Sequence, residues 1–414
     1  MTADAILEQG HNRTLITLAV GGFASQASVR LCDPMLPQLS AELGGSLGQA
    51  AQTITAFAVA YGLFQLVHGP MGDSFGKLRW VRYAAVVAAI ASAACMLAGT
   101  LLQLVALRFF AGAACSALIP LSLAWIGDGV PYHARQRVLA HFLTGSTSGA
   151  VFGQVAGGVL ADTIGWRLTF GFPAVVLAGV GLVLMLDARR ATRVQNATES
   201  TTGAGIATKT VRVPLPSPKA IAAQFGSVLA VPWARVILTV VTLEGLLVFG
   251  AFAYVPSWLH LRYELPLWQC GLAAAGFGLG GLSYVLASSW LIARLGQRGL
   301  ILGGAVFFAL GMLALGGQWW PAQTFFCALA GMGYFMLHNT LQVFATQMAP
   351  QIRGTAIAAF AVGLFGGQSV GVALGAVLVE TIGFESVLVG ATLLLIALAL
   401  ALAVLVERHD HAAA

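Results

Sequence analysis

Five ionisable side chains inside long apolar runs are the residues of this sequence best suited to do chemistry. They are two acids, Asp33 and Glu244, two arginines, Arg30 and Arg108, and His338. A charge at the centre of a membrane helix costs about 2.5–3.5 kcal/mol, so such a group keeps a partner or performs a function. Carboxylates and imidazoles in these surroundings can take up and release protons. We interpret the five as candidates for proton coupling.

The two acids differ in how their sequence surroundings place them. Arg30 and Asp33 are three residues apart, hence on one face of a helix. Asp33 is either a proton carrier or half of a static pair with Arg30 near the outer surface. Glu244 lies nine residues after Arg235, which puts it about 13 Å along a helix and near the middle of the bilayer. It either binds a proton or cation, or is bonded to a neighbouring helix.

The other two candidates are Arg108, a possible partner of the two acids, and His338. Arg108 is the only cation in its run, and we expect it to pair with Asp33 or Glu244, either as a switch or as a structural contact. His338 is followed by the polar residue Asn339, and it is either a titrating group or a hydrogen-bonded packing residue.

The elements that must position these groups are membrane helices. The chain has 414 residues, 58% of them hydrophobic and 9% charged, and its mean hydropathy is +0.85. Soluble domains carry about 25% charged residues, so this chain could not cover a water-facing surface. The composition excludes a soluble enzyme, a disordered protein and a nucleic-acid-binding domain.

Each spanning helix needs about 20 apolar residues. The twelve runs that meet this need lie roughly at 14–36, 50–71, 80–99, 102–127, 138–161, 167–187, 235–259, 268–293, 299–317, 321–347, 354–379 and 385–406.

The distribution of Lys and Arg predicts the orientation of these spans. If the N-terminus is cytoplasmic, 17 of the 21 Lys and Arg residues fall on the cytoplasmic side, as the positive-inside rule requires. The net charge of +6 is therefore a consequence of topology, and we expect no nucleic-acid partner. Both termini are predicted to be cytoplasmic.

An internal repeat divides the chain. Residues 145–165 and 363–383 align at a constant offset of 218 with nine identities, most of them glycines. Parallel repeats of this kind place a substrate site between the halves near the middle of the bilayer. We predict a six-helix half at 1–187, a basic cytoplasmic linker with a short interfacial helix at 188–234, and a second six-helix half at 235–414.

The loop after the second span resembles a motif of the major facilitator superfamily, G-x-x-x-D-[RK]-x-G-[RK]-[RK]. Gly69, Asp73, Gly76 and Lys77 fit the pattern, and Arg79 lies one place beyond its second basic position. The resemblance covers nearly the whole chain. It implies an all-α fold of twelve transmembrane helices in two pseudo-symmetric six-helix bundles.

The same resemblance implies contacts that latch the outward-open state. Asp73 would dock near Arg353 at the start of span 11, and the basic residues of the loop would meet Asp128 at the end of span 4. Ser74 stands where the pattern has a cation, so Lys77 or Arg79 would replace it. A basic loop that only sets topology is the alternative.

Span 5 resembles the exporter motif G-x-x-x-G-P-x-x-G-G. Gly149, Gly153, Gly157 and Gly158 match it, while Gln154 replaces the proline. Glycines that only pack helices would explain much of the match.

Three shorter segments also resemble the proton-coupled and drug-export branches of the family. They are Asp33–Pro37, Arg108–Gly112 and Gly165–Arg167. Residues 166 and 167 would otherwise be ordinary interface anchors.

The family resemblance implies that spans 1, 4, 7 and 10 line a central cavity. Each of these spans holds one of the polar candidates named above. Further side chains would make the cavity mainly aromatic, with sparse polar groups, which suits amphipathic organic molecules. They are otherwise core residues. The candidates are Tyr61, Gln65, Tyr254, Tyr334, Asn339 and Gln342.

These observations predict a monomeric transporter of the bacterial inner membrane that uses protons and a small-molecule substrate. The first hypothesis is export of an amphipathic or cationic organic compound in exchange for protons. The alternative is proton-coupled uptake of an organic anion or metallophore-like ligand, with Arg30 and Arg108 binding carboxylate.

A membrane enzyme is disfavoured because the sequence has no HExxH, GxSxG or P-loop motif. A non-transporting receptor is disfavoured by the short tails. We expect no cofactor and no metal, since the five cysteines have no ligand-like spacing.

Overall fold

The computed structural model describes residues 3–202 and 217–413, and all regular secondary structure in these ranges is helical. Within these ranges, nine segments are long and apolar enough to cross a membrane. One of them, α12 (Leu267–Leu313), holds two spans, because the non-helical backbone of Gly296 divides it. The remaining two of the twelve spans are α7 (Tyr132–Thr169) and α13 (Trp320–Gln347), which are more polar than the others. The predicted fold of twelve spanning helices in two halves is confirmed for the described residues.

In the first half, two spans are broken helices rather than continuous rods. Span 1 consists of a long helix, a 3-10 turn and a short helix, and span 4 consists of two helices. Helix α7 is kinked at Gly165, whose backbone is non-helical. The bounds are α1 (Ala3–Arg30), η1 (Asp33–Met35), α2 (Leu36–Leu43), α3 (Leu47–Phe75), α4 (Lys77–Cys95), α5 (Leu101–Cys115), α6 (Leu118–Gly129), α7 and α8 (Gly171–Thr202).

The second half repeats this plan after a short helix. Its first span is again broken, into α10 and α11, in the position that corresponds to α1 and α2. The bounds are α9 (Pro218–Ala230), α10 (Pro232–Phe252), α11 (Val255–Tyr263), α12, α13, η2 (Pro350–Ile352), α14 (Arg353–Ile382) and α15 (Phe384–Ala413).

Glycines at tight reversals occupy matching places in the two halves. Gly76 (φ 89°) joins spans 2 and 3, and Gly296 (φ 60°) joins spans 8 and 9. Gly165 (φ 83°) follows span 5, and Gly383 (φ 86°) follows span 11. Side chains other than glycine rarely adopt a positive φ. The repeat read from the sequence is therefore also a repeat of backbone conformation.

The halves also share one close helix crossing. A Cβ at Gly153 of α7 would lie 2.3 Å from the carbonyl oxygen of Ala27 on α1. At the matching position in the second half, a Cβ at Gly371 of α14 would lie 2.1 Å from the carbonyl oxygen of Leu246 on α10. Glycine lets these backbones touch, which is how helices pack closely in lipid. The sequence repeat is thus a packing repeat.

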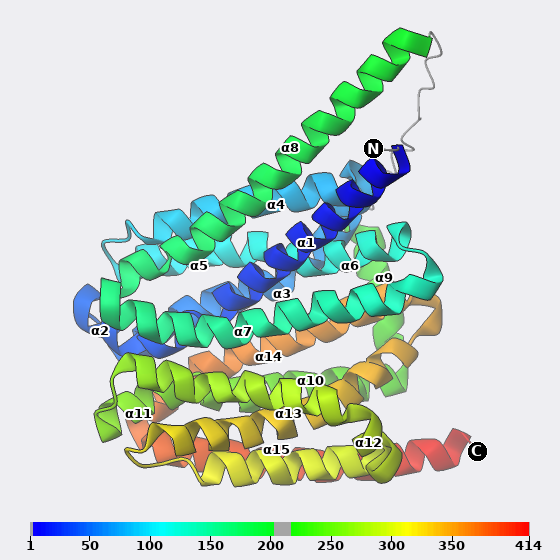
Figure 1. The fold of residues 1–414 in the computed structure, drawn as a ribbon. Coiled ribbons are helices and arrows are strands. Elements are labelled where there is room, and N and C mark those ends of the chain that lie inside the picture. The colour runs from blue at the N-terminus through cyan, green and yellow to red at the C-terminus, as the bar shows by residue number, and fades with distance from the viewer. Residues whose placement is uncertain (1–2, 203–216, 414) are drawn as a thin grey trace.

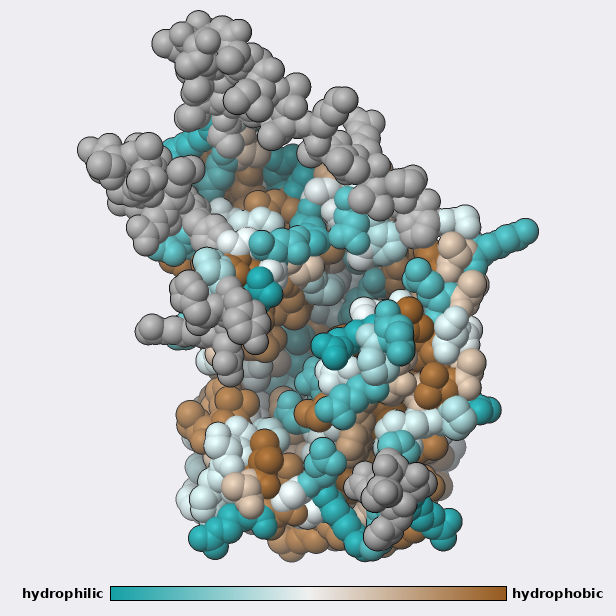
Figure 2. Space-filling model, turned by 90° about the vertical axis from the view of Figure 1, so that its right-hand side faces the viewer, coloured by the Kyte–Doolittle hydropathy of each residue, from teal (hydrophilic) through white to brown (hydrophobic). Residues whose placement is uncertain are grey.

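The bundle has two ends, which we name by the helices found there. The short helices α2 and α11 lie at one end, the α2 end, at the left of Figure 1. Helix α9 lies at the opposite end, the α9 end, with both chain termini (Figure 1). Across the two halves, α3 contacts α14 and α7 contacts α12. Figure 2 views the α9 end and shows a hollow between the halves.

The predicted linker, 188–234, includes residues 203–216, which lie outside the described residues. Before them, α8 continues past the predicted span to Thr202. After them, α9 begins at Pro218, where Ser217 caps the helix by accepting a hydrogen bond from the backbone N–H of Ala220 (3.2 Å). A proline is tolerated in this first position because its missing N–H would have no partner in the helix.

Candidate functional site

A cavity of about 200 Å³ lies between the two halves. It is lined from α1, α7, α10, α12, α13 and α14, so span 4 contributes none of its described lining. The aromatic lining residues are Phe249, Phe252, Phe277, Tyr334, Phe335 and Phe365. The polar ones are Gln26, Arg30, Thr147, Gln154, His338 and Gln368. An apolar cavity with a few convergent polar groups is typical of a site for a small organic ligand.

The first acid, Asp33, is fully buried beside this cavity, where α1 breaks into η1. Its Oδ2 lies 3.5 Å from Nη1 of Arg30 and accepts a hydrogen bond of 2.9 Å from Nε2 of Gln154 on α7. The Arg30 guanidinium stacks on the ring of Phe249 in the other half, 4.1 Å from its centroid. The charge of the buried Asp33 carboxylate is thus balanced by Arg30 of α1, and the same arginine contacts Phe249 of the opposite half.

The second acid, Glu244 of α10, is also fully buried. Its Oε2 lies 2.9 Å from Nδ1 of His338 on α13. The His338 ring stacks on Tyr334, with centroids 5.0 Å apart and planes at 18°. Both rings line the cavity, so Glu244 lies one residue behind its wall. Glu244 is therefore connected to the cavity wall through its contact with His338.

Arg108 has a different environment from the one we expected. Its guanidinium donates to the carbonyl oxygens of Ser28 (2.9 Å) and Thr53 (3.4 Å) and stacks on Phe57, 4.0 Å from the ring centroid. The structure pairs the two acids with Arg30 and His338 instead. Arg108 therefore ties α1, α3 and α5 together within the first half.

The predicted aromatic cavity residues lie in three kinds of place. Tyr334 lines the cavity. Tyr61 is not among the lining residues and packs against one of them, Phe365, with ring centroids 4.6 Å apart and planes tilted by 42°. The Tyr254 hydroxyl donates to the carbonyl oxygen of Val372 (2.7 Å) and so joins the break between α10 and α11 to α14. Of these three tyrosines, only Tyr334 is among the described lining residues of the cavity.

The predicted amides lie outside the described cavity lining. Asn339 donates from Nδ2 to the carbonyl oxygen of Phe335 (2.8 Å), one turn earlier in α13. Gln342 is exposed, and Gln65 is half-buried. Sequence reasoning missed three other amides that do line the cavity, Gln26, Gln154 and Gln368. These three glutamines could have been found from the sequence, because they lie within long apolar runs. The same feature identified the five ionisable candidates.

Among the described residues, five buried polar atoms of the site lack a hydrogen-bond partner. Two belong to the acids, Oδ1 of Asp33 and Oε1 of Glu244, and three belong to side chains of the cavity wall. The three wall atoms are Nη1 of Arg30, which has only its ion pair with Asp33 (3.5 Å), Oε1 of Gln154, and Nε2 of Gln368 on the opposite half. All three side chains line the cavity. A buried polar group without a partner is costly, so these atoms are available to hydrogen-bond a ligand.

The motif loop between α3 and α4 lies at the α9 end. Gly76 supplies its positive φ, and Lys77 forms an ion pair with Asp128 at the end of α6. Lys77 also lies 3.7 Å from Asp73. Arg353, the expected neighbour of Asp73, donates from Nε to the carbonyl oxygen of Thr346 (3.1 Å).

The other two residues of this loop have no such role in the described contacts. Gly69 faces open space, and Arg79 lies in the first turn of α4. Lys77 is therefore the loop cation that meets the acid of span 4.

The four motif glycines of α7 serve two different interfaces. At Gly149 and Gly157, as at Gly153, a Cβ would lie within 2.3 Å of a carbonyl oxygen of α1 or of the turn that follows it. At Gly158 it would instead lie 2.3 Å from the carbonyl oxygen of Leu267, on α12 of the other half. Gln154, where the motif has proline, keeps its place in the helix and donates to Asp33.

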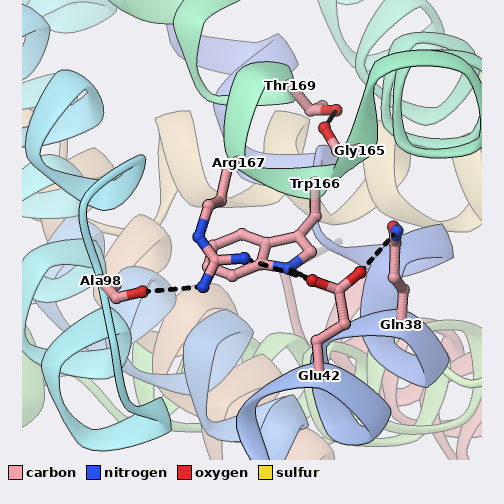
Figure 3. Close-up of polar contacts among 7 residues, drawn as sticks. All are labelled: Gln38, Glu42, Ala98, Gly165, Trp166, Arg167 and Thr169. Carbon is pink, nitrogen blue, oxygen red and sulfur yellow. Dashed lines mark hydrogen bonds and ion pairs between the residues drawn. The ribbon is translucent and has the colours of Figure 1, made fainter.

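Trp166 and Arg167 anchor a polar cluster at the α2 end (Figure 3). Glu42 of α2 accepts hydrogen bonds from Nε1 of Trp166 (2.8 Å) and Nη1 of Arg167 (3.2 Å), and its other oxygen accepts from Gln38 (3.0 Å). Arg167 also reaches the carbonyl oxygen of Ala98 (3.5 Å). The cluster ties the last turn of α7, which follows the kink at Gly165, to α2 within the first half.

Comparison with known proteins adds a family. A family model described as the Major Facilitator Superfamily matches residues 18–363 and 269–414. An uncharacterized MFS-type transporter of Bacillus subtilis (strain 168), YceJ, is 24% identical over 384 residues, 90% of each chain. The multidrug export protein EmrB of Escherichia coli (strain K12) is 27% identical over 170 residues, which are 41% of this chain and 33% of EmrB.

Two solved structures share the fold. A mutant of the nucleoside transporter NupG matches with a TM-score of 0.69 and 12% identity over 94% of this chain and 98% of that one. The POT family transporter PepTSo matches with a TM-score of 0.72 and 14% identity over 96% of this chain and 98% of that one.

Proposed function

Because the chain belongs to the major facilitator superfamily of transporters, we propose that it is a proton-coupled antiporter that exports a small amphipathic or cationic organic compound. The observation that carries this proposal is the placing of two buried acids around one aromatic cavity. Asp33 and Glu244 are both fully buried, and the partner of each, Arg30 or His338, lines that cavity. Intramembrane acids with such partners are typical of proton relays in transporters.

Alternating access would follow from the arrangement of the halves. In this structure they contact each other through α3–α14 and α7–α12, and a hollow opens between them at the α9 end (Figure 2). The Lys and Arg distribution in the sequence makes that end cytoplasmic, with both termini inside the cell. The conformation then corresponds to an inward-open state of a monomer in the bacterial inner membrane.

Proton antiport would arise from competition for the same buried charges. A cationic ligand in the cavity stabilises the charged forms of Asp33 and Glu244, and a bound proton neutralises them. Ligand and proton would therefore exclude each other, which is the requirement for exchange. Export is supported by the similarity of part of the chain to EmrB, a multidrug export protein, and by the glycine pattern of α7.

A second candidate function, uptake of an organic anion or metallophore-like ligand with protons, is favoured by one observation. Nη1 of Arg30 is buried in the cavity wall and has no hydrogen-bond partner among the described residues. A ligand carboxylate there would compete with Asp33 for Arg30. Protonation of Asp33 would then help the anion to bind, and both would move in the same direction.

The deciding experiment uses inverted membrane vesicles that hold a proton gradient. Ethidium represents an aromatic cation and 2-naphthoate an aromatic anion, and the pH inside the vesicles is followed by a fluorescent dye. We expect ethidium to release protons from vesicles with the wild-type protein and not from vesicles with Glu244→Gln or Asp33→Asn. Equal responses of wild type and both variants would overturn proton coupling through these acids. A response to 2-naphthoate alone would select the second candidate.

A further inference from the structure

Two carboxylates in matching positions of the two halves each bind a helix of the opposite half. Asp162, near the end of α7, accepts through Oδ2 a hydrogen bond of 2.7 Å from the backbone N–H of Trp268 on α12. Glu380, near the end of α14, accepts through Oε1 a hydrogen bond of 3.1 Å from the backbone N–H of Gly48 on α3. The two acids are 218 residues apart, which is the register of the internal repeat.

The two hydrogen bonds are chemically equivalent. Trp268 is the second residue of α12, and Gly48 is the second residue of α3. The N–H groups of the first helical turn have no acceptor within their own helix, and they carry the positive end of the helix dipole. A carboxylate is therefore the group best suited to bind there. The same kind of contact therefore occurs twice. An acid of the first half binds a helix of the second half, and an acid of the second half binds a helix of the first.

Close helix contacts lie beside each hydrogen bond. A Cβ at Gly48 would lie 2.9 Å from Cβ of Ala376 on α14, and a Cβ at Gly158 would lie 2.3 Å from the carbonyl oxygen of Leu267 on α12. The two halves are thus tightly apposed where the carboxylates bind. Any motion that separates the halves at the α2 end must break both hydrogen bonds, because each donor and its acceptor belong to different halves.

We propose that Asp162 and Glu380 are paired latches that hold the α2 end closed and set the ratio of the two open states during transport. They are positioning residues, since neither lines the cavity. The inference uses the alternating access of the proposed function and is independent of the substrate and of proton coupling. The Lys77–Asp128 ion pair lies at the opposite end and joins elements of one half only.

Two other glutamates at the α2 end provide matched controls. Glu42 binds Trp166 and Arg167 within the first half. Glu385 accepts a hydrogen bond from Nε1 of Trp258 (3.2 Å) and lies 3.9 Å from Nε of Arg262, within the second half. Each has a polar partner comparable to those of the latches, and neither contact crosses between the halves.

The test measures how fast a cavity residue becomes accessible from the α2 end. Ala274→Cys is the reporter, because Ala274 lines the cavity and is fully buried. The five native cysteines are buried and are first replaced by alanine. A membrane-impermeant methanethiosulfonate is applied separately to intact cells and to inverted vesicles, so that each side of the membrane is sampled by itself.

Asp162→Asn and Glu380→Gln keep an oxygen that can accept the backbone N–H but remove the negative charge that the helix dipole stabilises. We therefore expect each to speed labelling from the α2 side about two- to fivefold. The double variant should show roughly the product of the two effects, because the sites share no partner. Glu42→Gln and Glu385→Gln should label at the rate of the reporter protein. Asp162→Glu should restore slow labelling.

Equal labelling rates in the two latch variants and the two controls would overturn the proposal. Thermal unfolding of each purified variant shows that it is folded, so an unfolded protein cannot mimic an open gate. Because labelling needs neither substrate nor proton gradient, the latches can be supported even if the transport assay with ethidium and 2-naphthoate fails.

Discussion

Nδ1 of His338 on α13 lies 2.9 Å from Oε2 of Glu244 on α10, although 94 residues separate them in the chain. The first half contributes a different pair, Arg30 with Asp33, whose closest atoms are 3.5 Å apart. Arg30 and His338 both line the cavity, whereas each acid is fully buried behind it. The two halves share a fold, yet each brings its own acid–base chemistry to the common site.

The Glu244–His338 contact predicts a coupled loss of stability. His338→Ala removes the hydrogen-bond partner of a fully buried carboxyl group, and we expect it to lower the free energy of unfolding by about 1–3 kcal/mol. Combining it with Glu244→Leu should cost less than the sum of the two single changes, because the second substitution removes the orphaned group. Chemical unfolding of the purified protein measures all three values. Strictly additive losses would contradict a direct interaction.

The Gln154–Asp33 hydrogen bond predicts a defect in transport. Gln154→Leu keeps the approximate size of the side chain and removes the N–H that Asp33 accepts at 2.9 Å. Hydrogen bonds to charged groups contribute about 1.5–3 kcal/mol, so we expect the rate of proton-coupled transport to fall about tenfold or more. Gln342→Leu, which changes an exposed amide on α13, serves as the control. Vesicle assays in which both variants match the wild type would show that Gln154 has no part in coupling.

The glycine crossings predict a strong dependence of stability on position. Gly153→Ala and Gly371→Ala would each place a Cβ within 2.3 Å of a backbone oxygen, which forces the paired helices apart. We expect each to lower the free energy of unfolding by about 1–3 kcal/mol. Gly366→Ala, on the same helix as Gly371, has no atom within 4 Å of the new Cβ and should be neutral or slightly stabilising. Thermal unfolding in detergent compares the stability of the three variants. Equal losses of stability in all three would contradict the crossing geometry.

The ion pair between Lys77 and Asp128 predicts a small effect that depends on salt. Asp128 is 66% exposed, so water and ions screen the pair. Lys77→Met should lower the free energy of unfolding by about 0.2–1 kcal/mol at low ionic strength and by less at high ionic strength. Lys77→Arg, which keeps the charge, should behave like the wild type at both. The measurement is thermal unfolding at two salt concentrations, and a loss that is the same at both would show that packing, and not charge, is responsible.

The overall fold was predictable because its signals are local. The apolar runs and the placing of Lys and Arg are properties of short stretches of sequence, and the repeat around Gly153 and Gly371 is found by aligning two such stretches 218 residues apart. The Arg30–Asp33 pair was predictable for the same reason, since residues three apart share a helix face. Gly165 and Gly383 matched in the sequence and match again in their positive φ.

The partners of the remaining polar groups were decided by the tertiary structure. The sequence offered Asp33 and Glu244 as partners for Arg108, but that arginine donates to the backbone of α1 and α3. Which side chains meet across a bundle depends on the tilt and rotation of each helix, and packing against neighbouring helices sets both. The sequence by itself therefore determined the twelve helices, their repeat and the buried charges. Only the packed halves decided that His338 meets Glu244, that Gln154 meets Asp33, and that Asp162 and Glu380 each bind the opposite half.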